Sequence, residues 1–237
     1  MKKTAILLQA RMGSTRFPGK VMCDLLGKPV IARIVERLSF CQSVPKIIMV
    51  TSTNKENQAI IALADKIGIK SFVGEEDDVL DRFYKASKTF NLDVIVRITG
   101  DCPFIDPVIV DKVVGAFLSN AHLDYVSNIE PPTFPDGLDV EVFPFHALET
   151  MWKEAKERND REHVTAFIRR NLNHFRFLTI KYSRDLSKLN FALNYPEDIT
   201  FIKAVYQDLY DSKNPFLLED ILNWLRVHPE FNPHIRN

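Results

Sequence analysis

The chain has 237 residues, of which 46% are hydrophobic and 26% charged; this is an ordinary globular composition and excludes intrinsic disorder. Lysine plus arginine and aspartate plus glutamate each number 31, so the formal net charge is zero. No general electrostatic field therefore attracts nucleic acid or an anionic membrane, and no apolar stretch reaches the length of a membrane span. We expect neither a nucleic-acid partner nor a membrane association.

The first hundred residues alternate apolar runs with segments of helical apolar spacing. The apolar runs predict buried strands at residues 4–8, 46–50, 70–73 and 94–98. The segments between them predict helices at residues 30–38, 58–67 and 79–90. This alternation predicts an α/β fold with a mainly parallel central sheet and helices on both faces.

The second half begins with a predicted helix at residues 107–119, followed by a proline-rich stretch at 131–137 that cannot be helical. Apolar patterning predicts strands at residues 138–143 and 175–182. Helical spacing predicts further helices at residues 144–158, 162–172, 196–210 and 217–226. We expect a single domain over residues 1–237.

The loop after the first predicted strand has the composition of a phosphate-binding site. Residues 9–20 (QARMGSTRFPGK) contain three cations, Arg11, Arg16 and Lys20, together with two glycines and two hydroxyl groups. Glycine lets backbone N–H groups approach an anion, and the cations neutralise the charge of a triphosphate. The pattern is neither a P-loop nor a dinucleotide-binding motif, which argues against both of those classes. The alternative interpretation is a solvated turn.

These residues resemble the signature of the 3-deoxy-manno-octulosonate and acylneuraminate cytidylyltransferases. The resemblance is closer to the spore coat polysaccharide biosynthesis protein F group, through RITGDCP at 97–103, DGLDVE at 136–141 and REHVT at 161–165. It covers most of the chain and implies a Rossmann-like nucleotide-diphospho-sugar transferase fold of the GT-A-like type. Residues 1–120 would then form the nucleotide-binding half and residues 121–237 the acceptor-binding half. The resemblance also implies a homodimer, with residues 121–237 as the half that dimerises.

The resemblance implies an Mg²⁺-dependent enzyme that transfers CMP from CTP to an acidic, octulosonate-like or nonulosonate-like sugar and releases pyrophosphate, in surface polysaccharide or glycan biosynthesis. The implied catalytic residues are Arg11, Lys20 and Asp101. The first loop and the resemblance together assign nucleotide binding to a larger set, namely Gln9, Ala10, Arg11, Gly13, Ser14, Thr15, Arg16, Lys20, Arg82, Arg97, Thr99 and Gly100. For Arg82, an ordinary ion pair on a helix surface is the alternative.

Two positions are implied to hold the metal. Asp101 follows the predicted strand at 94–98, where a carboxylate can hold Mg²⁺ against a phosphate; the alternative is a helix cap or turn residue. The family's second carboxylate belongs to an Asp-x-Pro-Glu-Asp motif, which reads NYPED at 194–198 in this chain. Asn194 therefore stands where an aspartate is expected, and its amide oxygen is a weaker, neutral ligand. Asp139, Glu197 and Asp198 stay open as substitutes.

The polar residues of the second half are predicted to bind the acceptor, and they are Asp136, Asp139, Glu141, Arg161 and His163. Carboxylates suit sugar hydroxyl groups, and Arg161 can supply the cation that an acidic sugar requires. Surface or interface salt bridges are the alternative for each of them. Arg97 lies inside an apolar strand, so its charge must meet either a carboxylate or a ligand phosphate.

Two other functions stay open from the sequence. One is a glycosyltransferase with a nucleotide-sugar donor, although the Asp-x-Asp motif of such enzymes is absent from the expected strand end. The other is a nucleotide-binding protein that has lost catalysis, which Asn194 suggests.

The three cysteines favour a reducing compartment such as the cytoplasm. Cys23, Cys41 and Cys102 are odd in number and lack C-x-x-C spacing, which argues against a disulfide framework and against structural zinc. The apolar run after Lys3 ends at Gln9, below the length of a signal peptide.

Overall fold

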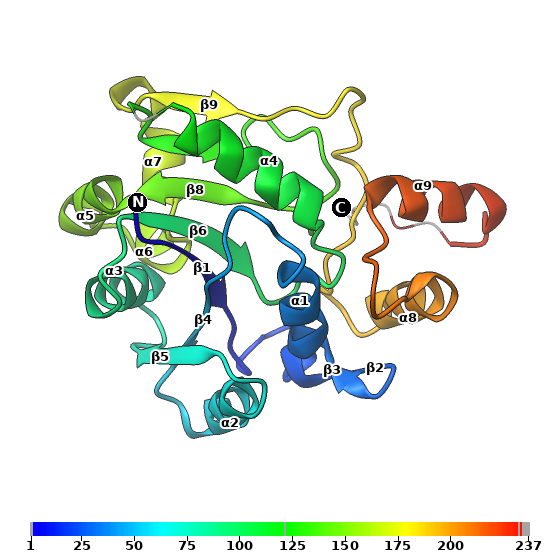
Figure 1. Ribbon diagram of the computed structural model, residues 1–237. Helices are drawn as coiled ribbons and strands as arrows, with labels where there is room; N and C mark the ends of the chain where they lie inside the picture. The colour runs from blue at the N-terminus through cyan, green and yellow to red at the C-terminus, as the bar shows by residue number, and fades with distance from the viewer. Residues whose placement is uncertain (1, 121, 232, 234–237) are drawn as a thin grey trace.

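Buried aliphatic strands form a sheet at the centre of the molecule (Figure 1). The computed structural model describes residues 2–120, 122–231 and 233, and within these residues the sheet has seven strands in the order β5-β4-β1-β6-β8-β7-β9. The strands are β1 Thr4–Gln9, β4 Ile47–Ser52, β5 Lys70–Gly74, β6 Val94–Thr99, β7 Tyr125–Ser127, β8 Glu141–Pro144 and β9 Phe177–Thr179.

The sheet is mainly parallel, as predicted. Strands β5, β4, β1 and β6 pair in parallel, β8 is antiparallel to β6 and to β7, and β7 pairs in parallel with β9. A separate two-stranded hairpin, β2 (Asp24–Leu25) and β3 (Lys28–Pro29), was not predicted from the sequence.

Helices cover both faces of the sheet, because the strands alternate their apolar side chains between two hydrophobic clusters. In β1, Ile6 and Leu8 point into the cluster that also contains α1, α2, α4, α8 and α9, whereas Ala5 and Leu7 point into the cluster of α3, α5 and α7. The helices are α1 Val30–Leu38, α2 Gln58–Lys66, α3 Val79–Thr89, α4 Pro107–Leu118, α5 Phe145–Glu154, α6 Arg158–Glu162, α7 Ala166–Arg170, α8 Asp198–Leu209 and α9 Leu218–Val227. Within the described residues, none of these helices has the length and apolar character that a membrane crossing requires.

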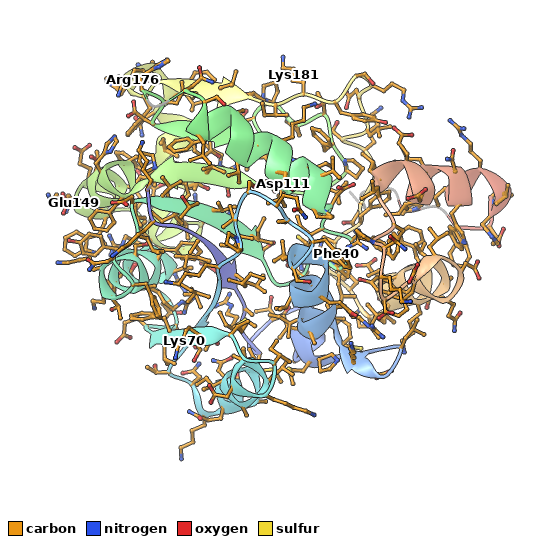
Figure 2. All side chains as sticks on the ribbon, viewed as in Figure 1. Phe40, Lys70, Asp111, Glu149, Arg176 and Lys181 are labelled. Atoms are coloured by element: carbon orange, nitrogen blue, oxygen red, sulfur yellow. The ribbon has the colours of Figure 1, made fainter. Side chains whose placement is uncertain are left out.

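Charged side chains lie on or beside the two outer strands. Lys70 of β5 lies at one edge of the sheet, and Arg176 and Lys181 flank β9 at the opposite edge (Figure 2). Charged side chains on short edge strands oppose pairing with the edge strand of another molecule.

The strand β1 lies at the point where the strand order reverses. The chain first adds β4 and β5 on one side of β1 and then crosses to add β6 on the other side. Gln9 at the end of β1 is in register with Thr99 at the end of β6. The loops that follow these two strands therefore lie next to each other, which is the usual place for a ligand in an open α/β sheet.

The strands and helices predicted for the first hundred residues are confirmed at nearly the predicted boundaries, and so are the helices that became α4, α8 and α9. The single helix predicted for residues 162–172 is wrong. α6 ends at Glu162 and α7 begins at Ala166, and between them Val164 has a φ of 47°. Val164 is fully buried in the cluster of α3, α5 and α7, and its packing fixes this backbone conformation. A positive φ interrupts a right-handed helix, so α6 and α7 are separate.

The predicted strand at residues 138–143 begins later than expected, at Glu141. The side-chain amide of Asn128 takes the place of strand pairing before that point, because it donates to Leu138 O at 2.8 Å and accepts from Val140 N at 2.8 Å. Two further elements of this half are shorter than predicted. α5 ends at Glu154 and not at residue 158, and β9 covers Phe177–Thr179 and not residues 175–182. The short strand β7 was not predicted.

Gly137 fixes the path of the chain into β8, which gives a first prediction. Its φ is +96°, and a Cβ at this position would lie 2.5 Å from the backbone nitrogen of Ala192. We expect Gly137→Ala to lower the free energy of unfolding by about 1–3 kcal/mol through backbone strain. The matched control is Gly115→Ala in α4, where a Cβ meets nothing within 4 Å; helix propensity should there raise stability by about 0.5–1 kcal/mol. Urea unfolding measures both variants, and equal effects would contradict the assignment.

Candidate active site

A pocket of about 460 Å³ lies where β1 and β6 end. Most of the residues predicted from the sequence line it, and these are Gln9, Ala10, Arg11, Ser14, Thr15, Arg16, Lys20, Arg97, Thr99, Gly100, Asp101, Asp136, Asp139, His163 and Asn194. The pocket thus joins the first loop, the loop after β6 and segments of the second half of the chain. The predicted residues Gly13, Arg82, Glu141 and Arg161 are not part of its lining.

The first loop is held in shape by its own backbone and by Asn57. Met12 N donates to Asn57 Oδ1 at 2.8 Å, and Met12 O accepts from the backbone nitrogens of Ser14 and Gly19, both at 2.9 Å. Gly19 has a φ of 74°, which turns the chain into the short 3₁₀ helix Lys20–Met22. The loop therefore presents Lys20 from a fixed backbone position.

Gly100 allows the second loop to approach the first. Its backbone nitrogen donates to Gln9 O at 2.7 Å, and a Cβ at this position would lie 2.9 Å from that same oxygen. A larger residue would push the two loops apart, so glycine is required here by close contact.

Lys20 and Asp101 form a short ion pair across the two loops. Lys20 Nζ lies 2.7 Å from Asp101 Oδ2, and the side chains are 10% and 28% exposed. Burial alone raises the pKa of Asp101, but the Lys20 ammonium group and a hydrogen bond with Thr99 outweigh it and hold the pKa below the ordinary value. Asp101 is therefore an ionised carboxylate that faces a cation.

Asn194 contacts the first loop through Arg16. Arg16 Nη2 donates to Asn194 Oδ1 at 3.2 Å, and its guanidinium carbon lies 5.0 Å from the centre of the Tyr195 ring. Asp198 accepts from the backbone nitrogens of Asn194 and Tyr195 at 2.8 and 2.7 Å. Asp198, one of the substitutes considered for the metal, thus fixes the backbone that carries Asn194.

Asp101 and Asn194 supply oxygen atoms to one pocket, and oxygen is the ligand type that Mg²⁺ requires. Among the residues that the structure describes, no group of three or more His, Cys, Asp or Glu side chains is arranged to hold a metal. Protein sites commonly bind Mg²⁺ through one or two carboxylates together with substrate phosphates. The residues present therefore fit an ion that is held jointly with a nucleotide.

Asp136 and Asp139 form an acidic side of the pocket. Burial raises the pKa of Asp139 to about 8, and the nearby carboxylates of Asp136 and Glu141 act in the same direction. Burial and Asp101 also raise the pKa of Asp136, partly offset by Lys20 and Arg16. In the described part of the chain neither side chain has a salt-bridge partner, so the oxygen atoms of both are available to a ligand that donates hydrogen bonds.

Arg11 meets two carboxylates, and the sequence interpretation left out one of them, Glu76. Arg11 Nη1 lies 3.0 Å from Glu76 Oε1, and Nη2 lies 3.5 Å from Glu162 Oε1 in the pocket wall. Glu76 follows β5 and also accepts a hydrogen bond from Ser52. The acidic run at residues 75–78, at the carboxyl end of a predicted strand, was the signal that could have identified it.

Two residues predicted to bind the acceptor are engaged elsewhere. Arg161 pairs with Asp78, with Nη2 and Oδ2 2.5 Å apart, and donates to Trp152 O at 2.8 Å. Glu141 is 1% exposed and forms an ion pair with Arg97 behind the pocket. The charge of Arg97 therefore meets a carboxylate, one of the two partners expected from the sequence.

Two residues predicted to bind the nucleotide lie outside the lining of the pocket. Gly13 packs against Glu56 and Glu76, within 3.4 Å of where its Cβ would stand. Arg82 is fully buried, and burial lowers its pKa to about 10. Its Nη1 donates to Glu75 O, whereas its Nε and Nη2 have no partner within the described residues.

Known proteins resemble this chain over nearly its whole length. The family described as cytidylyltransferase matches residues 5–219. The spore coat polysaccharide biosynthesis protein SpsF of Bacillus subtilis is 33% identical over 215 residues, which cover 87% of this chain and 88% of SpsF. A cytidylyltransferase from Leptospira borgpetersenii superposes with a TM-score of 0.94 at 30% identity, over 100% of this chain and 99% of that protein.

A more distant structure shares the fold. CMP:2-keto-3-deoxy-manno-octonic acid synthetase, determined in complex with CTP, superposes with a TM-score of 0.67 at 18% identity, over 87% of this chain and 100% of the synthetase. At this identity the likeness shows the Rossmann-like nucleotidyltransferase fold alone. Together with the observed sheet, it confirms the predicted fold class.

The buried pair of Arg97 and Glu141 generates a prediction about stability. Glu141→Leu leaves the Arg97 charge buried without its partner, so we expect the free energy of unfolding to fall by about 3–5 kcal/mol. The double variant Arg97→Met/Glu141→Leu should recover most of this loss, since it removes both charges from the interior. Urea unfolding at neutral pH measures the three proteins. A Glu141→Leu variant as stable as the parent would show that the pair is dispensable.

Asp139 generates a prediction about pH. Its pKa is about 8 in the folded protein against an ordinary value of 3.8, so between these values the folded state holds a proton that the unfolded state has lost. Stability must then fall as pH rises through this window. We expect Asp139→Asn to gain stability relative to the parent as pH rises from about 4 to about 8. Urea unfolding across this range, without nucleotide or divalent cations, tests it; a difference that does not depend on pH would contradict it.

Proposed function

The chain belongs to the cytidylyltransferase family, and we propose that it transfers a cytidylyl group from CTP to a sugar hydroxyl and releases pyrophosphate. The observation that carries this proposal is the pocket in which Arg11, Arg16 and Lys20 of the first loop surround a space bounded by Asp101. Transfer of a phosphoryl group depends mainly on positioning and on stabilisation of charge. A pocket of fixed cations supplies both, and the reaction requires no protein nucleophile.

We assign the nucleotide to the side of the pocket formed by the first loop. Arg11 and Lys20 neutralise the triphosphate, and both are presented by a loop whose backbone is fixed by Asn57 and Gly19. Arg82 supports the nucleotide from behind this loop, and its unsatisfied Nε and Nη2 are the observation in favour of that role.

Asp101 is the residue we propose for holding Mg²⁺, with Asn194 as a neutral second ligand. When bound, the ion supplies charge stabilisation on the phosphate oxygens as pyrophosphate departs. Asp101 holds its charge ready for this role because its pKa lies below the ordinary value. Asn194 adds an oxygen without charge, so nucleotide phosphates must complete the site.

The acceptor occupies the side formed by the second half of the chain. Asp136 and Asp139 accept hydrogen bonds from sugar hydroxyls, and His163 lies in the same wall. We propose an acidic sugar, of the octulosonate or nonulosonate kind, in surface polysaccharide or glycan biosynthesis. Because Arg161 is bound to Asp78, Arg16 takes over as the cation for its carboxylate; the Arg16 contacts with Asn194 and Tyr195 are to neutral groups.

The cellular setting and the assembly stay predictions. We propose the cytoplasm, because three cysteines without C-x-x-C spacing favour a reducing compartment. The homodimer and the division into a nucleotide half and an acceptor half rest on the resemblance.

The test is release of pyrophosphate from CTP, ATP, GTP or UTP in the presence of Mg²⁺ and a panel that contains 3-deoxy-manno-octulosonate, N-acetylneuraminate and neutral sugars. We expect CTP with an acidic sugar to give turnover. Lys20→Ala and Arg11→Ala should each lose about 1.5–3 kcal/mol of triphosphate binding, because a charge-assisted contact is removed. Lys112→Ala, which removes a charge from the exposed surface of α4, is the matched control.

The outcomes separate the alternatives. Turnover with a nucleotide-sugar donor, and not with CTP, would support a glycosyltransferase. Binding of CTP without turnover on any acceptor would indicate a nucleotide-binding protein. Unchanged nucleotide binding in both Lys20→Ala and Arg11→Ala would remove the first loop from the mechanism.

A further inference from the structure

Both positions assigned to the metal face a cation of the first loop. Lys20 Nζ lies 2.7 Å from Asp101 Oδ2, and Arg16 Nη2 lies 3.2 Å from Asn194 Oδ1. One carboxylate oxygen of Asp101 and the amide oxygen of Asn194 are therefore each occupied by a positively charged donor. This arrangement links the phosphate-binding loop directly to the metal position.

We propose that the ammonium group of Lys20 holds the place of the divalent cation in the free protein, and that the metal binds at Asp101 only when a nucleoside triphosphate draws Lys20 away. This inference rests on the proposed function, in that the triphosphate is the ligand of the first loop. It adds an order of binding and a gate that the function alone does not require.

The surroundings of Lys20 suit it to this role. Lys20 is 8% exposed, so its stem is packed against the protein and its head has little freedom to move into solvent. An ammonium group is a compact point charge with three donors, which resembles a small cation more closely than a planar guanidinium does. Lys20 reaches Asp101 from the start of the 3₁₀ helix that follows Gly19, whereas Asp101 belongs to the loop after β6.

Lys20 opposes the binding of a divalent cation at Asp101. Like charges at the separation of a common ligand repel strongly, and the metal would gain one carboxylate and one neutral amide in return. Mg²⁺ also gives up its water reluctantly and depends on several good oxygen ligands. Arg11 and Arg16 line the same pocket and add to the repulsion. The free protein is therefore expected to exclude the ion.

A triphosphate reverses each of these conditions. Its anionic oxygens compete with Asp101 for Lys20, and they neutralise the arginines of the first loop. The same oxygens complete the coordination of the metal. Once Lys20 has moved, Asp101 is open and Asp136 lies nearby as a further negative charge. Nucleotide and metal must then strengthen each other's binding by the same factor.

Asn194 makes the second position easy to open. Its contact with Arg16 is a hydrogen bond to a neutral amide, whereas an aspartate at this position would form an ion pair with Arg16. Asn194→Asp should therefore leave the free protein as unable to bind the metal as the parent, and should strengthen metal binding only in the presence of nucleotide.

The experiment measures binding of Mn²⁺, a paramagnetic ion with the oxygen preference of Mg²⁺, by electron paramagnetic resonance of the unbound ion. Free parent protein should bind Mn²⁺ weakly, and Lys20→Met should bind it at least about tenfold more tightly without nucleotide. Arg11→Met removes the same charge from the same loop, away from Asp101, and should change the affinity by about threefold at most. Addition of CTP should tighten Mn²⁺ binding to the parent much more than to Lys20→Met.

The site of the added ion is located by a double variant. Lys20→Met/Asp101→Asn should bind Mn²⁺ as weakly as the parent without nucleotide, because it lacks the carboxylate that the Lys20→Met substitution exposes. Thermal unfolding checks that each variant is folded, and Lys20→Gln, which keeps a polar head without the charge, replaces Lys20→Met if that variant melts early.

Three results would overturn the proposal. The parent protein could bind Mn²⁺ as tightly without CTP as with it, or neither uncharged Lys20 variant could show tighter Mn²⁺ binding than the parent. The tighter binding could also persist when Asp101→Asn is added. Failure of the proposed function gives a different result. The measurements of Mn²⁺ binding without nucleotide need neither CTP nor an acceptor, so their result does not depend on whether pyrophosphate is released.

Discussion

The contact between the ends of β1 and β6 is the constraint on which the rest of the site depends. Pairing of Gln9 with Thr99 and the short hydrogen bond from Gly100 N to Gln9 O bring two loops of opposite charge character together. Without that approach, Lys20 and Asp101 would belong to separate parts of the surface. The reversal of strand order at β1 makes this contact between the two loops possible, because it places the ends of β1 and β6 side by side. In open α/β sheets a crevice lies beyond the strand ends at such a point.

A chain without net charge builds a charged pocket by pairing its cations locally. Lys20 meets Asp101, Arg11 meets Glu76 and Glu162, and Arg97 meets Glu141. These pairs differ in exposure to solvent and therefore in the free-energy cost of separating them. Glu141 is buried beneath Arg97, and separation of this pair is costly. The pairs at the pocket surface are partly solvated and can be exchanged for a ligand at modest cost.

The side of the pocket that we propose for the acceptor is built from backbone outside regular elements. Asp136 bonds through its backbone to Leu189 and Phe191 at 3.0 and 2.7 Å, and Gly137 packs directly against Ala192. The segment before β8 and the segment before α8 are thus fixed to each other, and they carry Asp136 and Asn194 into one wall. The first loop is held by separate contacts to Asn57, but the segment before α8 also reaches it through the hydrogen bond between Arg16 and Asn194.

The sequence by itself determined the alternation of strands and helices, the first loop, and Asp101 at a strand end, because these features are written in local periodicity and composition. Only the tertiary structure decided which charges meet. Arg161 turns to Asp78, Glu141 lies behind the pocket with Arg97, and Glu76 joins Arg11 from another strand end. It also decided the break at Val164 and the raised pKa of Asp139. Burial and partner choice depend on residues far apart in the chain, and no local pattern contains that information.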